Sequence, residues 1–418
     1  MPNARRLQNF MTAIALLLAL PAFVVAVLPA QAEKAAKVAA KSAENMKAGE
    51  TAQKKPETPR LILSRSEILQ SDPERLARAG RHIIVGYHSL SEIKQLIEKK
   101  AIGGIFITDH NVRGRNAASM KSTIDALQAT RKEQGLPPLI IAADQEGGAV
   151  SRLSPPLKRQ PSLAQAVSKA ANDEERKKIV EDYARIQAAE LKRIGVTLNF
   201  APVVDLKLNP KNRNDGETRL RLRAIDADPY LVSKVAGWYC DVLAESNIMC
   251  TLKHFPGLGR VTRDTHVATA EISATEGTLE LNDWVPFRRV MAKPNAVTML
   301  GHVRIGVLDK STPASFSAPV INTLIRGTWQ YDGLLVTDDF SMGAVTRSKD
   351  GVGGAAVKSL NAGMDFVLVS YTEKDFDVMM SAVLAAEAAG ELDGKMLDAS
   401  RVRIERILSA PIAPDAAQ

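Results

Sequence analysis

Two segments of the sequence combine residue types that can carry out acid–base and nucleophilic chemistry. The segment KHFPGLGRVTRDTH (253–266) begins with a Lys-His pair and ends with Asp264 and His266, two residues apart. Histidine exchanges protons near neutral pH because its unperturbed pKa is about 6.5, and a neighbouring carboxylate fixes the ring tautomer and stabilises the imidazolium. The segment LLVTDDFSMGA (334–344) places Asp338 directly after an apolar run and a threonine. Residues of these types can take part in acid–base and nucleophilic chemistry where the fold brings them to one site.

Each of these residues also has a purely structural explanation. Asp338 and Asp144 could cap the helices that follow them, and His266 could be an ordinary histidine of a surface loop. A histidine at a strand end, such as His254, is more often a core residue, but the adjacent Lys253 is costly to bury without a polar ligand. What separates the two explanations is whether these residues meet at one place in the fold.

The rest of the chain alternates short apolar runs with amphipathic segments. The apolar runs lack polar alternation, which is typical of strands buried on both faces of a parallel sheet. The runs span 82–88, 103–109, 139–144, 196–205, 247–255, 296–303, 333–339 and 365–370. Between them, stretches such as 173–195 and 228–246 have an acidic start and apolar residues at helical spacing.

Eight β–α repeats predict an α/β fold, a single (β/α)8 TIM-type barrel. A doubly wound open sheet is the alternative. No G-x-G-x-x-G motif opens the first helix and the sequence has no P-loop, so a nucleotide site lacks support. In a barrel of this kind the active site lies at the carboxyl ends of the strands. Polar residues lie at or near the ends of the third, fourth, fifth and seventh runs, at Asp144, Asp205, Lys253 and Asp338, so we expect them to meet on one rim.

The segments 253–266 and 334–344 resemble the signatures of glycoside hydrolase family 3, specifically its NagZ-type β-N-acetylhexosaminidases. The segments DQEGGAVSRL (144–153) and NFAPVVDL (199–206) extend the resemblance, which covers roughly residues 61 to 410. The resemblance implies a glycosidase that cleaves with retention, which needs a nucleophile at the anomeric carbon and an acid for the leaving oxygen.

The resemblance also implies catalytic roles. Asp338 matches the family nucleophile, and its neighbour Asp339 is expected to orient loops or ligands. His266 and Asp264 match a histidine–aspartate dyad that replaces the usual second carboxylic acid. His266 would donate a proton in the first step and activate water in the second.

Five further residues match family positions that bind the non-reducing sugar: Asp144, Arg152, Arg223, Lys253 and His254. Arg221 competes with Arg223 for its position, because the surrounding loop is unusually rich in charge. His302, after the sixth strand, either lines the pocket or has a structural role. The sequence departs from the family pattern at three single positions and in the loop 219–223, which lacks the usual Arg-Ser-Phe. The single positions are Ala149, Leu258 and Thr328.

The N-terminal segment has the sequence pattern of an export signal. Arg5 and Arg6 precede an uncharged run over residues 7–32 that ends in an A-x-A sequence. This pattern predicts a signal peptide over residues 1–32, with an uncleaved membrane anchor through residues 7–32 as the alternative. We expect an exported protein, periplasmic or secreted; the anchor would instead hold it at the membrane, facing the periplasm.

The basic charge lies mainly near the N-terminus. Counts of 55 Lys and Arg against 47 Asp and Glu give a net charge of +8, of which residues 1–32 carry +2 and residues 33–60 carry +3. Residues 33–60 are rich in Ala, Lys and Glu and lack aromatic residues, so we expect a flexible linker. Residues 61–418, the expected glycoside hydrolase domain, keep only +3, too little for a nucleic-acid-binding surface.

Cys240 and Cys250 lie ten residues apart, on a predicted helix and the next strand. We expect two buried thiols, with Cys250 facing the barrel wall; a disulfide is the alternative in an oxidising compartment. The sequence has no metal-ligand cluster and the retaining mechanism needs no cofactor, so we expect neither. It makes no prediction about oligomeric state.

The leading functional prediction is a retaining exo-β-N-acetylglucosaminidase. The resemblance implies removal of non-reducing N-acetylglucosamine from peptidoglycan fragments in which it is linked to N-acetylmuramic acid or its anhydro form. One alternative is a β-glucosidase or β-xylosidase, although few residues follow the eighth strand to form the second domain that such relatives use. A phosphorylase of the same family is another. A third is a non-catalytic barrel that binds the cell wall.

Overall fold

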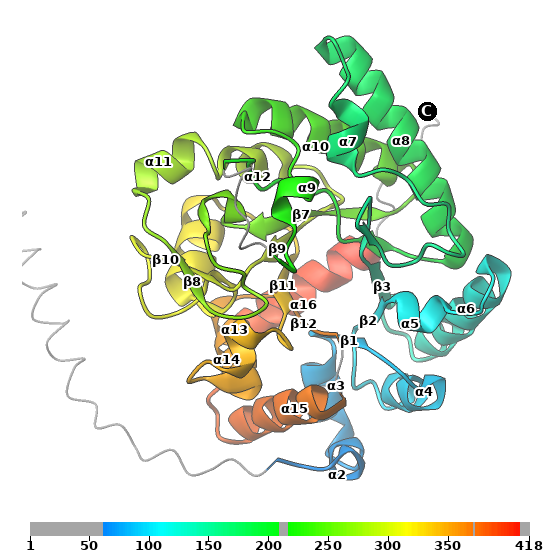
Figure 1. The fold of residues 1–418 in the computed structure, drawn as a ribbon. Helices are drawn as coiled ribbons and strands as arrows, with labels where there is room; N and C mark the ends of the chain where they lie inside the picture. The colour runs from blue at the N-terminus through cyan, green and yellow to red at the C-terminus, as the bar shows by residue number, and fades with distance from the viewer. Residues whose placement is uncertain (1–61, 209–215, 371–372, 410–418) are drawn as a thin grey trace, which may run out of the picture. The chain divides into compact units, whose positions relative to one another are not determined.

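The computed structural model describes residues 62–208, 216–370 and 373–409 (Figure 1). The predicted signal segment (1–32) and linker (33–60) lie outside the described residues. Within the described ranges, no helix combines the length and apolar character needed to cross a bilayer.

Eight parallel strands close into a barrel, which confirms the predicted (β/α)8 fold over the open-sheet alternative (Figure 1). Each predicted apolar run contains one of them. In order around the barrel, the strands are β1 (Ile83–Gly86), β2 (Gly104–Ile107), β3 (Ile140–Ala143), β6 (Leu198–Asn199), β7 (Met249–Phe255), β9 (Ala296–Leu300), β11 (Leu335–Asp339) and β12 (Phe366–Val369). Register pairs such as Ile84 with Gly104 and with Leu368 close the ring at β1.

Two short strand pairs lie in the loops beyond the barrel. They are β4 (Gln145–Gly147) with β5 (Val150–Ser151), and β8 (Ala270–Ile272) with β10 (Val303–Ile305). The first pair follows β3, and the second brings together the loops that follow β7 and β9. Both pairs therefore add fixed structure to the connections that leave the barrel strands.

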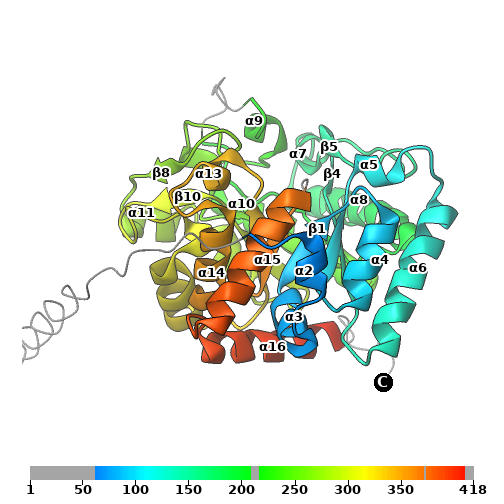
Figure 2. The same cartoon turned by 90° about the horizontal axis from the view of Figure 1, so that it is seen from below.

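Helices surround the barrel (Figures 1 and 2). The longer ones are α3 (Pro73–Gly80), α4 (Leu90–Glu98), α6 (Ala117–Glu133), α8 (Asp173–Ile194), α10 (Pro229–Glu245), α14 (Gly351–Ala362), α15 (Glu373–Ala388) and α16 (Gly394–Ser409). The shorter ones are α2 (Arg65–Leu69), α5 (Asp109–Val112), α7 (Leu163–Val167), α9 (Leu220–Arg223), α11 (Glu276–Leu281), α12 (Val285–Val290) and α13 (Gly343–Thr346), with the 3-10 turns η1 (Leu258–Arg260) and η2 (Ala314–Phe316) and the π-helical segment η3 (Pro319–Thr328).

Local sequence explains where the two helices singled out above begin and end. The side chain of Asn172 accepts the backbone N–H of Glu175 and caps α8, whose first turn carries three acidic residues that favour the positive end of the helix dipole. Gly195 ends α8 with φ of 87°, a left-handed conformation that glycine adopts without strain. In α10, Asp228 is the cap and Pro229 the first helical residue. Both predicted helices are therefore confirmed.

Apolar side chains form one core outside the barrel and one inside it. The outer core lies between the strands and the surrounding helices. The inner core includes Phe106, Phe200, Met299 and Leu368, and at the other end it contacts Ile404 of α16. Figure 2 shows α16 lying across that end of the barrel. The helix therefore covers the amino-terminal end of the barrel interior.

Cys240 of α10 and Cys250 of β7 form a disulfide, so the prediction of two thiols was wrong. Both residues are fully buried, as predicted. The chain turns directly from α10 into β7, and β7 returns along the helix that precedes it, with a Cα–Cα distance of 5.5 Å between the cysteines. That distance lies within the range a disulfide requires. The sequence could not show it, because it depends on how the helix packs on the strand.

A buried carboxylate ties α16 to the barrel. Asp365, at the start of β12, accepts hydrogen bonds from Arg403 of α16 at 2.9 Å and from Arg326 of η3 at 2.6 Å. The Ser400 hydroxyl and the backbone N–H of Leu335 complete its contacts. Burial alone would raise the pKa of Asp365, but the two guanidinium groups outweigh it and lower that pKa. Asp365 is therefore an ionised carboxylate that joins α16 and η3 to the start of β12.

We expect Asp365→Asn to lower the free energy of unfolding by about 3 kcal/mol, because it leaves two buried guanidinium groups without a carboxylate. Urea denaturation at neutral pH measures this. The control Glu405→Gln breaks an exposed ion pair with Arg401 on the same helix and should cost less than about 1 kcal/mol.

The pKa of Asp365 gives a second check on the same variant. Because its folded-state pKa is lowered, Asp365 stabilises the fold above the unfolded pKa of about 3.9. This contribution is lost as the pH falls from that value through the lower, folded-state pKa. The stability difference between wild type and Asp365→Asn should therefore shrink in acid. A difference that stays constant with pH would contradict this account.

Candidate active site

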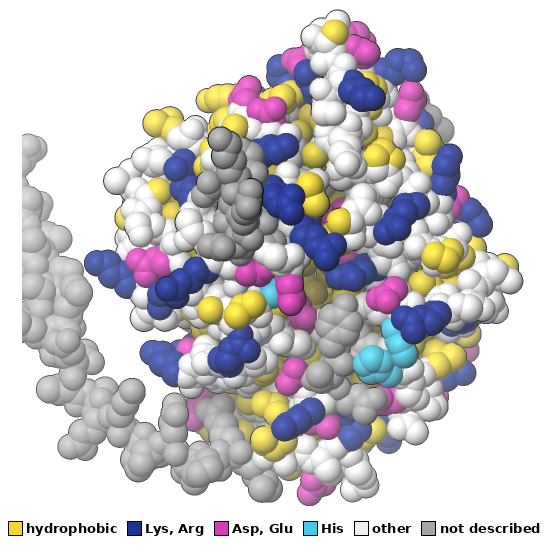
Figure 3. Space-filling view, viewed as in Figure 1, with side chains coloured by type: hydrophobic (Ala, Val, Ile, Leu, Met, Phe, Trp, Pro, Cys, Tyr) yellow, Lys and Arg dark blue, Asp and Glu magenta, His cyan; other side chains and the backbone are white. Residues whose placement is uncertain are grey.

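The carboxyl ends of the strands surround a cavity of about 470 Å³. Its floor is the apolar top of the inner core, formed by Phe106, Phe200, Met299 and Leu368. Seven of the eight predicted site residues line it: Asp144, Arg152, Arg223, Lys253, His254, His266 and Asp338. The eighth, Asp264, contacts the His266 ring. Figure 3 shows basic and acidic side chains bordering a hollow on this face.

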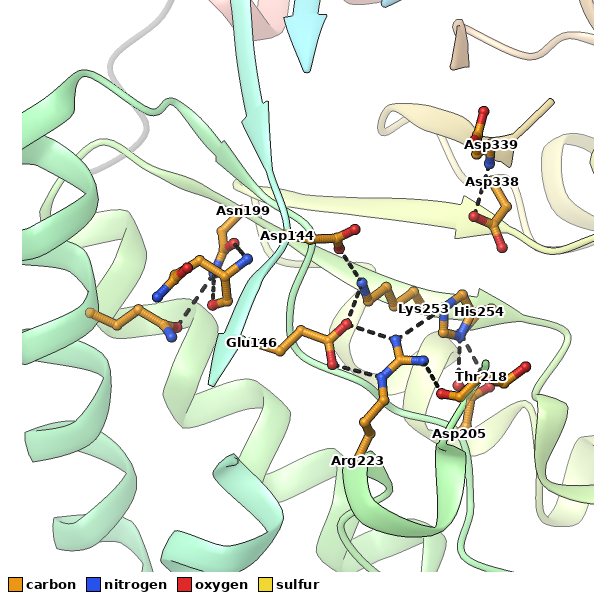
Figure 4. A network of polar contacts seen from close by, with 12 residues as sticks. Asp144, Glu146, Asn199, Asp205, Thr218, Arg223, Lys253, His254, Asp338 and Asp339 are labelled. Carbon is orange, nitrogen blue, oxygen red and sulfur yellow. Dashed lines mark hydrogen bonds and ion pairs between the residues drawn. The ribbon is translucent and has the colours of Figure 1, made fainter. Parts of the chain in front are cut away.

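Two buried cations and two carboxylates form one wall of the cavity (Figure 4). Lys253 Nζ lies 2.7 Å from Asp144 Oδ1 and 2.6 Å from Glu146 Oε1. Arg223 forms a bidentate pair with Glu146, with Nε 2.8 Å from Oε2 and Nη2 2.7 Å from Oε1. Burial lowers the pKa of Lys253, but Asp144 and Glu146 outweigh it, so that its pKa is raised and the amine stays charged.

Glu146 is a site residue that the sequence reasoning missed. Burial would raise its pKa, but the charges of Arg223 and Lys253 hold that pKa below its usual range. The available signal was its position two residues after Asp144, because alternate residues of an extended segment share a face. Glu146 joins the two cations into one unit.

The structure also separates the two candidate arginines. Arg223 lies in the cavity wall, whereas Arg221 is exposed and lines a small crevice beside the site. Arg152 is exposed at the cavity edge, and its backbone N–H donates to the carbonyl oxygen of Asp144 at 3.1 Å. Of the two candidates, Arg223 is the one positioned to contact a bound ligand.

His254 is held by a buried carboxylate, Asp205. The Asp205 Oδ2 atom lies 2.7 Å from His254 Nδ1, and Oδ1 accepts the backbone N–H groups of His254 and Leu258. This pairing makes Nδ1 the donor and leaves Nε2 toward the cavity, 3.5 Å from Arg223 Nη2. The side chain of Leu258 is buried in the outer core. The departure from the family pattern at this position therefore does not reach the cavity.

Asp338 and Asp339 end β11 with different surroundings. Burial raises the pKa of Asp338, but nearby His254, His302 and His266 outweigh it and lower that pKa. Burial raises the pKa of Asp339, which accepts the backbone N–H groups of Ser341 and Ser370. Asp338 is thus an ionised carboxylate in the cavity, and Asp339 orients the loops around it.

His302 supports the same strand end and does not line the cavity. Its Nδ1 atom lies 2.8 Å from the Ser315 hydroxyl, and Nε2 lies 2.9 Å from the carbonyl oxygen of Asp339. Burial lowers the pKa of His302. Because a carbonyl oxygen only accepts hydrogen bonds, Nε2 carries a proton and donates it to the Asp339 carbonyl. Of the two roles considered for His302, the geometry corresponds to the structural one.

The predicted acid–base pair, Asp264 and His266, lies on the loop between η1 and β8. His266 Nδ1 is 2.8 Å from Asp264 Oδ1, which also accepts the His266 backbone N–H at 3.0 Å. Burial would raise the pKa of Asp264, but hydrogen bonds from His266, Glu217 and Thr218 hold it well below its usual range. A carboxylate on Nδ1 leaves Nε2 as the atom that exchanges a proton with a ligand.

The arrangement can perform nucleophilic and acid–base chemistry on a polar ligand. An ionised carboxylate and a half-exposed histidine line one cavity, beside a wall of charged hydrogen-bonding groups. Among the described residues, no group of three or more His, Cys, Asp or Glu side chains is placed to hold a metal ion.

Comparison with known proteins places the chain in a family. The sequence matches the Glycosyl hydrolase family 3 N terminal domain over residues 77–407. It is 30% identical over 327 residues to a β-hexosaminidase of Idiomarina loihiensis, covering 78% of this chain and 94% of that protein. It is also 30% identical over 344 residues to the β-hexosaminidase LpqI of Mycobacterium tuberculosis, covering 80% and 82%.

Comparison with solved structures gives the same family as the sequence match. A glycoside hydrolase family 3 β-N-acetylglucosaminidase from Paenibacillus superposes with a TM-score of 0.73 at 28% sequence identity. The superposition covers 82% of this chain and 64% of that one, so this chain spans just under two thirds of its length. The family match extends over well more than half of the sequence and includes all the cavity residues described above. The chain belongs to glycosyl hydrolase family 3.

Proposed function

We propose that this protein is a retaining β-N-acetylhexosaminidase that removes N-acetylglucosamine from the non-reducing end of its substrate. The observation that carries the proposal is the placement of the Asp264–His266 pair on the same cavity as the ionised Asp338. The hexosaminidases among its relatives support the amino sugar.

In the first step the Asp338 carboxylate attacks the anomeric carbon as the bond to the leaving oxygen breaks. His266, as imidazolium, transfers its Nε2 proton to that oxygen, and Asp264 stabilises the positive ring beforehand. The products of this step are a glycosyl ester on Asp338, a neutral His266 and the released alcohol. The lowered pKa of Asp338 keeps the nucleophile charged at neutral pH.

In the second step the same groups act in reverse. Neutral His266 takes a proton from a water molecule while the water oxygen attacks the anomeric carbon, and the ester bond to Asp338 breaks. Asp338 returns to a carboxylate and His266 to an imidazolium. Two inversions at one carbon give net retention.

The charged wall supplies the sugar-binding groups. Lys253 and Arg223 donate, Asp144 accepts, and the Nε2 atom of His254 also faces the cavity. Because Lys253 and Arg223 are already paired with carboxylates, their positions are fixed before a sugar binds. A preorganised wall loses little conformational entropy on binding.

We further propose that the substrate is a peptidoglycan fragment in which N-acetylglucosamine is linked to N-acetylmuramic acid. Two exposed arginines, Arg152 and Arg219, line the cavity, and muramic acid carries a carboxylate that such charges attract. Export through the N-terminal segment would bring the enzyme to the cell wall. A β-glucosidase, a phosphorylase and a non-catalytic wall-binding barrel are the competing functions.

The first test uses p-nitrophenyl N-acetyl-β-glucosaminide and the matching β-glucoside. We expect release from the former, and Asp338→Ala should lower kcat at least about a thousandfold because no ester can form. The control Asp125→Asn removes an exposed carboxylate of α6 and should leave kcat unchanged. Release from only the glucoside would reject the amino-sugar specificity, and release from neither would favour the binding barrel.

The second test concerns the acid–base pair. With the p-nitrophenyl substrate, His266→Ala should form the ester but hydrolyse it about a hundredfold or more slowly, so that a burst precedes slow turnover. Azide attacks the anomeric carbon without needing a base, so it should accelerate turnover and yield a β-glycosyl azide. Absence of both the burst and the azide effect would show that His266 is not the base.

The third test concerns the leaving group. We expect Arg219→Gln to lower kcat/KM for the disaccharide of N-acetylglucosamine and N-acetylmuramic acid about two- to fivefold, the worth of an exposed charge. The same variant should leave kcat/KM for neutral N,N′-diacetylchitobiose unchanged. Equal losses on both disaccharides would mean that Arg219 does not recognise a carboxylate.

A further inference from the structure

The segment 216–223 contacts both the acid–base pair and the sugar-binding wall. Thr218, near its start, is buried. The Thr218 hydroxyl donates to Asp264 Oδ1 at 2.8 Å, and its backbone N–H donates to Asp264 Oδ2 at 3.1 Å. Its carbonyl oxygen accepts from Arg223 Nη1 at 2.7 Å. One residue thus bonds the dyad carboxylate with two donors and the sugar-binding arginine with its acceptor.

We propose that Thr218 is a positioning residue for the acid–base step, which fixes the Asp264–His266 pair relative to the sugar held by Arg223 and Glu146. This inference rests on the proposed glycosidase function, because it assigns a role within that reaction. Thr218 itself needs no contact with substrate; it acts through Asp264.

The geometry at Asp264 supports this role. Oδ1 receives the Thr218 hydroxyl and His266 Nδ1, so the same oxygen atom that orients the ring is itself oriented by Thr218. The Thr218 hydroxyl also lies 3.4 Å from His266 Nδ1, close to the hydrogen bond it supports. Without the hydroxyl, the carboxylate would keep its backbone donors but could rotate about its own side-chain bonds. The ring would then lose a fixed direction for its Nε2 proton.

The carbonyl oxygen of Thr218 links the dyad to the sugar-binding wall through Arg223. Arg223 uses Nη1 for the Thr218 carbonyl, and Nε and Nη2 for the Glu146 carboxylate. Arg223 and Glu146 are both almost fully buried, with side-chain exposures of 8% and 6%. A fixed, buried pair at one end and the dyad at the other set the distance from the sugar to the proton donor. Misplacement by a fraction of an ångström is costly for proton transfer.

A merely structural role for Thr218 predicts different kinetics. If the residue only stabilised the loop, its loss would lower thermal stability or reduce all activities together. If it positions the acid, the loss should depend on how much the leaving group needs a proton. A nitrophenolate leaves with little protonation, whereas a phenolate needs more help.

The experiment compares Thr218→Val with wild type on p-nitrophenyl and phenyl N-acetyl-β-glucosaminides, which carry the same sugar. Valine keeps the size and the backbone donors and replaces the hydroxyl with a methyl group. We expect kcat/KM to fall about tenfold or more on the phenyl glycoside and less than about threefold on the p-nitrophenyl glycoside. The inhibition constant of N-acetylglucosamine should stay within about twofold, because the wall that binds the sugar is unchanged.

Two further variants complete the design. Thr218→Ser restores the hydroxyl and should return the phenyl glycoside rate to within about threefold of wild type. Thr269→Val removes a hydroxyl from the loop that carries Asp264 and His266. That hydroxyl donates to the Ala344 carbonyl at 3.3 Å, so this control should show no dependence on the leaving group. If Thr218→Val does not fold, Thr218→Ala removes the same hydroxyl and carries the same expectation.

Equal losses on both glycosides, or no loss on either, would overturn the role of Thr218 while leaving the proposed function intact. A wild-type enzyme that cleaves neither glycoside would overturn the proposed function, and this inference with it. An unequal loss that serine rescues supports the positioning role.

Discussion

The charge balance among Asp144, Glu146, Arg223 and Lys253 is the constraint on which the cavity depends. A lysine and an arginine are buried beside an apolar floor, and neither could remain there charged without a carboxylate in contact. These four residues come from the connection after β3, the connection after β6, and strand β7 itself. Their pairing therefore fixes two connections relative to a barrel strand and leaves directional donors on one wall.

At the opposite end of the barrel, a buried carboxylate is also paired with cations, but there the pairing holds a helix in place. There Asp365 holds Arg326 and Arg403, and this pairing fixes α16 across the closed end. Between the two charged layers the barrel interior is apolar. Because side chains are packed throughout, the strands cannot shift independently. Residues at the carboxyl ends of the strands are therefore held in fixed positions. Asp338 is such a residue.

Much of the fold could be predicted because its signals are local. Each strand is an apolar run, and the site residues lie within short segments at strand ends, such as Asp338 after its run. The features that escaped prediction join residues distant in sequence: Glu146 with Arg223 across 77 positions, and Asp205 with His254 across 49. The disulfide depends on helix packing in the same way. No spacing rule could reveal these contacts, because the closure of the barrel creates them.

The two parts of the proposed catalytic apparatus differ in how they are held. Asp338 ends a strand, and its neighbour Asp339 is fixed by backbone hydrogen bonds on both sides. The dyad lies on a loop without a strand ladder, so the direction of Asp264 must come from donors elsewhere, which Glu217 and Thr218 supply. The proposed histidine acid thus lies on one loop and is oriented through Asp264 by a second loop. The departure from Arg-Ser-Phe at 219–223 lies in that second loop, where it keeps one arginine in the wall and places two at the surface. If the proposed mechanism holds, sequence change there would alter how the proton donor is positioned while every reacting group stays the same.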